Sequence, residues 1–323
     1  MRSVAEIQQI ISKKINGFCE KNGSGQIYVP INYMLSLGGK RVRPTLSLMA
    51  ANLFDDEIDQ AIYPAIAVEI FHNFTLMHDD IMDKSPMRRG QQTVHEKWSD
   101  DVAILSGDAM MIQSYQLLIK TKTEVLAEVM GVFNRTALEV CEGQQQDMDF
   151  EKRDNVALEE YLEMIRLKTS VLVAGGMKIG ALINGADQNS QQHIYDFGEN
   201  LGIAFQLQDD YLDAYGDTDK TGKQKGGDII SGKKTFLLVR ALEKASEPER
   251  EALKALLASS LAPALKVKSV MEIFTRLGVD EELTGKARAY HDKALASLEA
   301  VNVADERKID LRLMAEALLG REQ

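Results

Sequence analysis

Helical spacing of apolar residues, along the whole chain, is the feature that most limits the folds open to this sequence. Near the N-terminus, for example, the chain places Val4, Ile7, Ile11, Ile15 and Phe18 at intervals of three and four residues, which puts side chains on one face of a helix. No segment shows the alternation of apolar and polar residues, bounded by turn signals, that marks a half-buried strand. Only 6 prolines interrupt the 323 residues. The sequence therefore predicts an all-α protein.

The periodic segments define a series of predicted helices. They cover residues 3–20, 30–37, 42–54, 58–83, 101–119, 122–147, 156–184, 187–215, 233–245, 248–258, 264–277, 279–299 and 304–319. Two stretches, 58–83 and 169–184, are apolar around most of their circumference, which is typical of helices buried inside a large bundle. No repeat of solenoid length and no linker rich in Pro, Gly or Ser divides the chain. We therefore expect a single domain over residues 1–323, built as one large multi-helix bundle.

The charge and cysteine content exclude several classes of partner. The chain has 38 Lys and Arg against 49 Asp and Glu, a formal net charge of −11, so its surface is poorly suited to nucleic acid or anionic lipid. Any anionic substrate then requires a local cluster of basic residues. Cys19 and Cys141 make no disulfide framework. The sequence contains no run of about 18 uncharged apolar residues, which is the length needed to span a membrane. We expect a cytoplasmic enzyme that binds no nucleic acid and does not insert stably into a membrane.

Two clusters of aspartates carry the clearest chemical signal. Each has the spacing DDxxD at the C-terminal end of a strongly apolar predicted helix. The clusters consist of Asp79, Asp80 and Asp83, and of Asp209, Asp210 and Asp213. Three carboxylates within one turn repel one another, and at a helix C-terminus they also oppose the macrodipole. One such cluster is as readily explained by a solvated helix end. Two of them indicate binding of a divalent cation, and all-oxygen ligation favours Mg²⁺.

Basic residues accompany both acidic clusters. They lie in GGKRVRP (Lys40, Arg41, Arg43), in MRRG (Arg88, Arg89), in RLKTS (Lys168) and in TGKQKGGDIISGKKTF (Lys223, Lys225, Lys233, Lys234). Arginine forks and lysine ammonium groups suit the oxygens of a diphosphate. A single basic pair is usually a solvated surface feature. Basic residues beside both acidic clusters favour a site for a metal–diphosphate complex.

The chain resembles the trans-isoprenyl diphosphate synthases, the farnesyl and geranylgeranyl group, in two aspartate-rich motifs, FHNFTLMHDDIMDKSPMRRG and FQLQDDYLDAYGD. The resemblance covers nearly the whole chain, because GGKRVRP, GQQQD, KTS and GKQKGGD also occur in the family's order. It implies an all-α bundle of the isoprenoid synthase type with a central substrate cavity. It also implies a homodimeric, Mg²⁺-dependent transferase that joins isopentenyl diphosphate to an allylic diphosphate.

The resemblance further implies a role for individual residues. Isopentenyl diphosphate would be bound by Lys40, Arg43, His72 and Arg89, and the allylic diphosphate by Arg88, Lys168, Lys223 and Lys233. Three Mg²⁺ ions would be held chiefly by Asp79, Asp83 and Asp209, with Asp80, Asp210 and Asp213 assisting. Lys168, Thr169 and Gln206 would act at the reaction centre with Asp79 and Asp209, and Gln144 and Asp147 match the family's Gln and Asp on the preceding helix.

Two other activities compete with this interpretation. A class I terpene cyclase ionises the same substrates but needs no pocket for a second diphosphate, which the GGKRVRP and Arg88–Arg89 clusters supply. A non-catalytic partner subunit of a heteromeric synthase generally lacks the aspartate motifs, whereas both are present here. Incubation with isopentenyl diphosphate and an allylic primer separates the three by their products.

Product length depends on the residues that precede the first motif. The first motif lacks the two-residue insertion found in many bacterial farnesyl synthases. In the resemblance Phe74 helps to stop elongation, although it could also be an ordinary core residue, and a second aromatic in place of Thr75 would stop elongation sooner. The small Thr75 leaves about one further helical turn, ~5 Å, roughly one isoprene unit. We expect geranylgeranyl diphosphate, with farnesyl diphosphate as the alternative and a longer chain less favoured.

Overall fold

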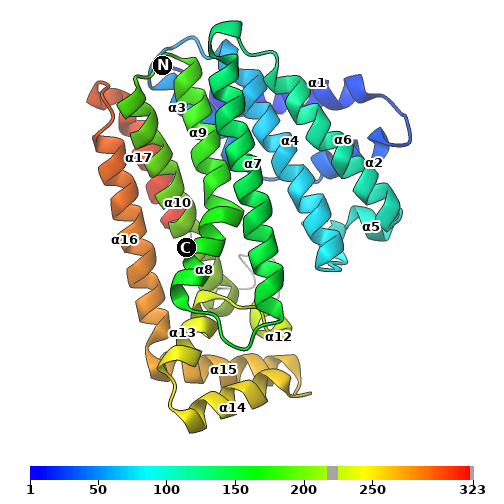
Figure 1. Ribbon diagram of the computed structural model, residues 1–323, viewed down its shortest axis with the longest axis vertical. Coiled ribbons are helices and arrows are strands. Elements are labelled where there is room, and N and C mark those ends of the chain that lie inside the picture. The colour runs from blue at the N-terminus through cyan, green and yellow to red at the C-terminus, as the bar shows by residue number, and fades with distance from the viewer. Residues whose placement is uncertain (217–224, 321–323) are drawn as a thin grey trace. The chain divides into compact units, whose positions relative to one another are not determined.

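The computed structural model of the protein describes residues 1–216 and 225–320 (Figure 1). The chain divides into two compact units, each defined by the contacts among its own Cα atoms. Unit 1 comprises Met1–Arg135, Gly175–Tyr195 and Val301–Leu311, and unit 2 comprises Thr136–Ala174, Asp196–Ala300 and Arg312–Gln323. Some helices supply residues to both units: α7 (Thr123–Glu151), α9 (Val171–Ile183), α10 (Gln188–Tyr215) and α17 (Asp305–Leu319).

The rest of unit 1 is built around a buried helix, α4. The helix α4 covers Asp59–Met82. The elements around it are α1 (Val4–Asn22), α2 (Tyr28–Ser36), α3 (Val42–Asn52), β1 (Met87–Arg88), β2 (Gln91–Gln92), α5 (Val94–Lys97) and α6 (Asp100–Leu118). All residues of α4 from Ala65 to Phe71 are buried. Small residues allow its neighbours to approach closely, since a Cβ added to Gly107 of α6 would lie 2.5 Å from His78 Cδ2. The helix that carries the first aspartate motif is therefore fixed by packing on several sides.

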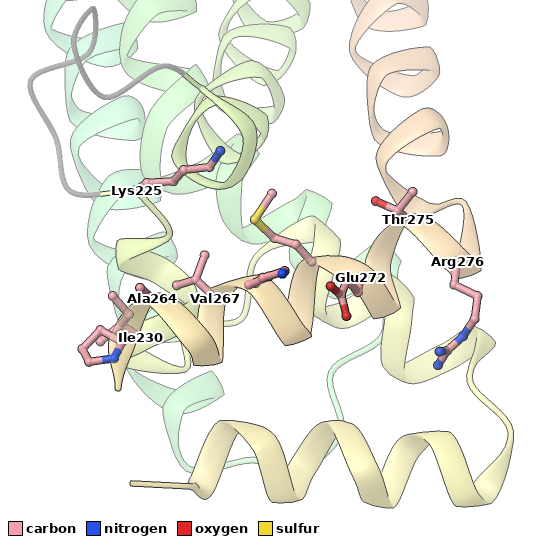
Figure 2. Close-up of a pocket in the computed structure, with 10 residues that line it drawn as sticks. Lys225, Ile230, Ala264, Val267, Glu272, Thr275 and Arg276 are labelled. Carbon is pink, nitrogen blue, oxygen red and sulfur yellow. The ribbon is translucent and has the colours of Figure 1, made fainter. Parts of the chain in front are cut away.

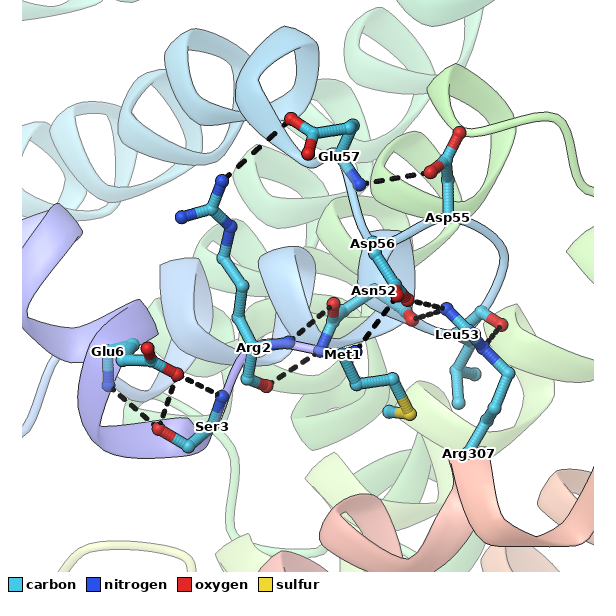
Figure 3. A network of polar contacts seen from close by, with 10 residues as sticks. All are labelled: Met1, Arg2, Ser3, Glu6, Asn52, Leu53, Asp55, Asp56, Glu57 and Arg307. Carbon is cyan, nitrogen blue, oxygen red and sulfur yellow. Dashed lines mark hydrogen bonds and ion pairs between the residues drawn. The ribbon is translucent and has the colours of Figure 1, made fainter.

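A polar network within unit 1 joins the connection between α3 and α4 to α17 (Figure 3). Arg307 donates to the backbone oxygens of Leu53 at 2.6 Å and Asn52 at 2.8 Å, and to the Asp56 carboxylate at 2.6 Å. Asn52 Nδ2 donates in turn to the backbone oxygen of Arg2 at 2.8 Å. The last carbonyls of a helix have no partner within the helix. Arg307 supplies one, so a segment from late in the chain caps α3.

Unit 2 has its own hydrophobic core. Its remaining elements are α8 (Leu158–Ile165), the π-helical turn η1 (Arg166–Ser170), α12 (Gly227–Ser231), α13 (Phe236–Lys244), α14 (Glu247–Ala258), α15 (Pro263–Leu277) and α16 (Val279–Glu299). Tyr161, Phe236 and Phe274 are among the large buried side chains of this core. Ser246 and Glu249 form a capping box at the start of α14, which satisfies backbone N–H groups that the helix leaves free.

The all-α prediction is confirmed, and each predicted helix has a counterpart. The predicted helix over 156–184 differs in one respect, because α8 and α9 are joined by η1, where the Val171 N–H donates to the Arg166 carbonyl. The sequence did not predict α5, α12 or the β1–β2 hairpin, since such short elements carry no periodic pattern. Among the described residues, no helix combines the length and the apolar character needed to cross a membrane. A single domain over residues 1–323 stays a prediction.

Candidate active site

The first aspartate motif ends α4 in unit 1. The Asp83 N–H donates to the Asp79 carbonyl at 2.9 Å, so these two aspartates lie one helical turn apart on the same face. Asp83 is exposed and Asp79 is partly exposed. Asp80, by contrast, is 2% exposed, and Arg88 Nε donates to both of its carboxylate oxygens at 2.9 Å. Burial raises the pKa of Asp80, and the ion pair with Arg88 offsets only part of that effect.

The β1–β2 hairpin sets the positions of Arg88 and Arg89. Its strand pairing leaves Arg89 and Gly90 as the two turn residues, with φ of 52° and 74°. Positive φ at both positions is typical of the type I′ turn of a two-residue hairpin. This conformation costs a residue other than glycine about 1–2 kcal/mol, so other contacts must hold it. One of them is a hydrogen bond from the Arg89 guanidinium to the Gly38 carbonyl.

Four arginines lie near enough to the half-buried His72 for their charges to act on it, and together they form a basic cluster: Arg41, Arg43, Arg88 and Arg89. Burial, and then the positive charge of these arginines, lowers the pKa of His72 well below its usual range. The neutral ring places Nε2 3.0 Å from Arg43 Nη1, which can donate to it. Arg43 Nε is buried and has no hydrogen-bond partner among the described residues. A buried donor without an acceptor is costly, so the cluster fits a bound anion.

The other basic residues of GGKRVRP have different surroundings. Lys40 is exposed. Arg41 forms an ion pair with the buried Glu69 at 2.5 Å and also donates to the Leu35 carbonyl. Arg41 is thus largely committed to the protein, whereas Arg43 and Lys40 are better placed to meet a ligand.

The second aspartate motif ends α10 in unit 2, and its middle residue is again buried. Asp210 accepts hydrogen bonds from the Tyr161 hydroxyl, from Gln206 Nε2 at 3.2 Å and from the Phe236 N–H at 3.1 Å. Burial raises the pKa of Asp210 to about 7, because the charge of Asp228 adds to the burial effect and the three hydrogen bonds oppose it only in part. In both motifs the middle aspartate therefore has protein partners, and its assisting role at a metal stays a prediction.

The π-helical turn η1 places two of the predicted catalytic residues next to each other. Lys168 Nζ lies 2.5 Å from Asp147 Oδ2, and Lys233 Nζ lies 3.9 Å from the same oxygen. Thr169 Oγ1 donates to Gln206 Oε1 at 3.4 Å. Unit 2 therefore brings together two lysines predicted to bind the allylic diphosphate and the two side-chain oxygens predicted to face the reaction centre.

A glycine on α7 permits this arrangement. A Cβ added to Gly143 would lie 2.7 Å from Lys168 Cα and 2.8 Å from the Leu167 carbonyl carbon. These are backbone atoms, which cannot rotate away as a side chain can. Only glycine at this position lets α7 and η1 approach so closely.

The aspartates offer oxygen ligands but no ready-made cage. Among the residues that the structure describes, no three His, Cys, Asp or Glu side chains are grouped so that they could hold a metal ion. Mg²⁺ is commonly held by one or two carboxylates together with waters and substrate phosphates. Asp79 with Asp83, and Asp209 with Asp213, are pairs four residues apart at helix ends. Such donors fit Mg²⁺ that is bound jointly with a diphosphate.

The predicted chain-length residues lie on α4, one turn before the first motif. The Phe74 ring is 4.8 Å from the His78 ring and 5.3 Å from the Phe71 ring, and Phe71 in turn is 5.3 Å from Phe133. Thr75 Oγ1 donates to the His72 carbonyl at 2.8 Å, so its hydroxyl is satisfied within the helix. Phe74 and Thr75 are both half-buried. An aromatic cluster surrounds Phe74, and its role in chain length stays a prediction.

The glycine-rich loop also contains the lysines Lys223 and Lys225. Lys223 falls outside the described residues. Lys225 lines a pocket of about 900 Å³ in unit 2, together with Val267 and Thr275 of α15 (Figure 2). None of the residues to which the resemblance assigns a role lines this pocket.

Sequence reasoning did not identify two buried partners of the site. Tyr161 donates to Asp210 from 49 residues away, and Glu69 holds Arg41 from 28 residues away. Both lie on apolar helix faces, where a polar residue among buried neighbours was the only available signal.

Comparisons with known proteins agree with these features. Residues 25–274 match the family model described as polyprenyl synthetase. The chain is 38% identical to a short chain isoprenyl diphosphate synthase of Methanothermobacter thermautotrophicus, over 90% of this chain and 89% of the relative. A crystal structure of a geranylgeranyl pyrophosphate synthase has a TM-score of 0.94 and 42% identity and covers 100% of both chains. A geranylgeranyl pyrophosphate synthase from Corynebacterium glutamicum, complexed with isoprenyl diphosphate and magnesium, has a TM-score of 0.87 and 26% identity over 98% of both chains.

Proposed function

We propose, because the chain belongs to the polyprenyl synthetase family, that it is a short-chain prenyltransferase that joins isopentenyl diphosphate to an allylic diphosphate. The observation that carries the proposal is the basic cluster around His72, which lies in the same unit as the first DDxxD motif and leaves the buried Arg43 Nε in need of an acceptor. A terpene cyclase has no use for such a second anion site.

In this proposal Lys40, Arg43, His72 and Arg89 bind isopentenyl diphosphate. Lys40, Arg43 and Arg89 provide the positive charge. His72 stays neutral because of its lowered pKa and orients the Arg43 guanidinium by accepting from it. The diphosphate of this substrate is not released in the reaction, so its site needs charge and fixed geometry but no group that cleaves a bond.

The allylic diphosphate is bound by Arg88, Lys168, Lys223 and Lys233. Asp79, Asp83 and Asp209 hold Mg²⁺, for which we propose three ions, with Asp80, Asp210 and Asp213 assisting. Bound Mg²⁺ supplies positive charge that stabilises the leaving diphosphate.

The reaction breaks the allylic C–O bond and leaves an allylic cation. The double bond of isopentenyl diphosphate attacks that cation and forms the new C–C bond. A proton then passes to an oxygen of the released diphosphate, which generates the new allylic double bond. Thr169 and Gln206 place oxygens near the cation, which lowers its energy electrostatically. The apolar surface of α4 keeps water away from it.

We assign geranylgeranyl diphosphate as the product, with farnesyl diphosphate as the alternative. The similarity to a geranylgeranyl pyrophosphate synthase structure over the full length of both chains supports the assignment. The half-buried Phe74 and the small Thr75 on α4 are consistent with it.

A homodimer is part of the proposal, and exposed apolar residues on α6 and at its C-cap, Ile119, support it. Leu105, Ile112 and Ile119 recur every seven residues and are 59%, 56% and 60% exposed. Ile104 and Met111 flank them at the same spacing and are also exposed. A heptad row of this kind is typical of a seam between paired helices.

The reaction is proposed to be cytoplasmic, in keeping with the acidic composition and two free cysteines, Cys19 and Cys141.

The substitution Asp79→Ala tests the proposed function. Turnover of isopentenyl diphosphate with an allylic primer should fall by ~10²–10³ or more, since a charge that acts in the transition state is lost. The thermal midpoint in chelator should not fall, because a carboxylate at a helix C-terminus opposes the macrodipole. Asp59→Ala, at the exposed N-terminal end of the same helix, is the matched control and should keep full activity. Near-normal turnover of Asp79→Ala, or a cyclised hydrocarbon product from the native chain, would overturn the assignment.

A further inference from the structure

A tyrosine on α2 holds the hairpin that carries Arg89. The Tyr33 hydroxyl donates to the backbone carbonyl of Gln92 at 2.7 Å, across 59 residues of sequence. Gln92 belongs to β2, and the turn between β1 and β2 consists of Arg89 and Gly90. The Tyr33–Gln92 hydrogen bond therefore attaches the base of this hairpin to α2.

The Tyr33 ring is itself fixed by the segment that follows the hairpin. Lys97 Nζ lies 3.8 Å from the centroid of the ring, and the Trp98 ring meets it edge-on at 5.2 Å. Cation–π contacts and edge-on ring pairs are both favourable. The aromatic contacts keep the hydroxyl aimed at Gln92.

The tip of the hairpin is bound to the same part of the chain. The Arg89 guanidinium donates to the Gly38 carbonyl, and Gly38 follows Tyr33 by five residues. The guanidinium also lies directly over Gly39, because a Cβ added there would be 2.8 Å from three of its atoms. One short segment, residues 33–39, thus holds the hairpin at its base and at its tip.

We propose that Tyr33 is a positioning residue for isopentenyl diphosphate, which acts by keeping Arg89 in place beside Arg43 and His72. The inference rests on the proposed function, which assigns Arg89 to that substrate. Arg89 has a positive φ of 52°, a conformation that a freed hairpin would tend to leave. Attachment at the base as well as the tip keeps the arginine preorganised before the substrate arrives, which lowers the entropic cost of binding.

The substitution Tyr33→Phe tests this role, because it removes the hydroxyl and keeps the ring contacts. Titration with isopentenyl diphosphate alone, so that no chain can grow, should show a dissociation constant raised about 2- to 10-fold, the effect of one hydrogen bond. The KM for isopentenyl diphosphate should rise by the same factor, whereas kcat and the KM for the allylic primer should stay within twofold. The thermal midpoint should change little, because Gln92 is exposed and water can replace the donor.

A double-mutant cycle with Arg89→Ala separates this inference from the function on which it rests. Arg89→Ala should weaken binding of isopentenyl diphosphate, and adding Tyr33→Phe to it should have no further effect, since Tyr33 acts through Arg89. Tyr63→Phe is the matched control, because the Tyr63 ring also carries a lysine, Lys120 Nζ at 4.4 Å, but lies at the opposite end of α4 from the first motif.

The outcomes are distinct. The role of Tyr33 is refuted if Tyr33→Phe leaves binding of isopentenyl diphosphate unchanged, raises both KM values equally, or keeps its effect in the Arg89→Ala background, while the proposed function stands. Should Arg89→Ala bind isopentenyl diphosphate as tightly as the native protein, the assignment of Arg89 fails, and this inference fails with it.

Discussion

The substitution Gly143→Ala tests whether the position of η1 controls catalysis. The new Cβ would lie 2.7 Å from Lys168 Cα and 2.8 Å from the Leu167 carbonyl carbon, whereas ordinary contact begins at 3.4 Å. The Lys168 backbone nitrogen lies closer still to the new Cβ, so relief of these contacts requires a shift of more than about 0.7 Å. Because the atoms are backbone on one side and a helix on the other, the whole turn with Lys168 and Thr169 must move.

The expected effects on stability and on rate differ in size. Inserting a methyl group into a packed contact costs about 1–3 kcal/mol, and alanine in place of glycine in a helix returns about 1 kcal/mol. The free energy of unfolding should therefore fall by about 0–2 kcal/mol, a decrease of a few degrees in the thermal midpoint. Displacement of catalytic groups by close to 1 Å can cost ~10²-fold in rate. Activity should thus fall much further than stability.

Single-turnover kinetics with an allylic primer and calorimetry in chelator measure the two effects separately. Gly131→Ala is the control, since it lies on the same helix with no atom within 4 Å of its added Cβ. That variant should be about 1 kcal/mol more stable than the native protein and equally active. If Gly143→Ala turned over within threefold of the native rate, η1 would tolerate the shift and the link between this contact and catalysis would be refuted.

Three further expectations follow from particular residues. The pKa of Asp210 is about 7 in the folded protein, against an ordinary value of 3.8, so the folded state binds the proton more tightly and becomes less stable as pH rises from about 4 to 7. In metal-free protein, calorimetry should show that Asp210→Asn raises the thermal midpoint more at pH 8 than at pH 4. An equal change at both pH values would contradict this expectation. Phe74→Ala should lengthen the product by at least one isoprene unit and Thr75→Phe should shorten it toward farnesyl diphosphate, as seen by chromatography after dephosphorylation; unchanged products from both would mean that other residues end the chain. Light scattering should report a dimer of the 36.0 kDa chain and dissociation on Ile112→Lys, whereas a native monomer at micromolar concentration would rule the dimer out.

The helices could be predicted because their signal is local. The apolar spacing of α10 reflects which face of that helix is buried, the nearly continuous apolar run of α4 reflects burial on most sides, and the DDxxD motifs lie at the ends of these two helices. Family resemblance added roles that no spacing contains, such as the pairing of Lys40 and Arg43 with one substrate.

The rest depends on contacts between segments far apart in sequence. Nothing near Asp210 indicates that Tyr161 will reach it, and nothing near Arg43 indicates His72 at 29 residues' distance. The turn η1 reads as regular helix in RLKTS. The π-helical turn contains one residue more than an α-helical turn, and it lies where Gly143 of α7 contacts the backbone of Lys168.

Unit 1 contains residues from both the start and the end of the chain, so it cannot be completed until late in synthesis. Unit 1 begins at Met1 but includes Val301–Leu311, whose Arg307 caps α3. At ribosomal rates of about 5–20 residues per second, residue 311 is added to the chain roughly 16–60 s after the start. Until then the carbonyls of Asn52 and Leu53 lack their arginine partner. Nascent chains arrested before residue 301 should therefore be degraded by added protease, whereas chains released after residue 320 should resist it.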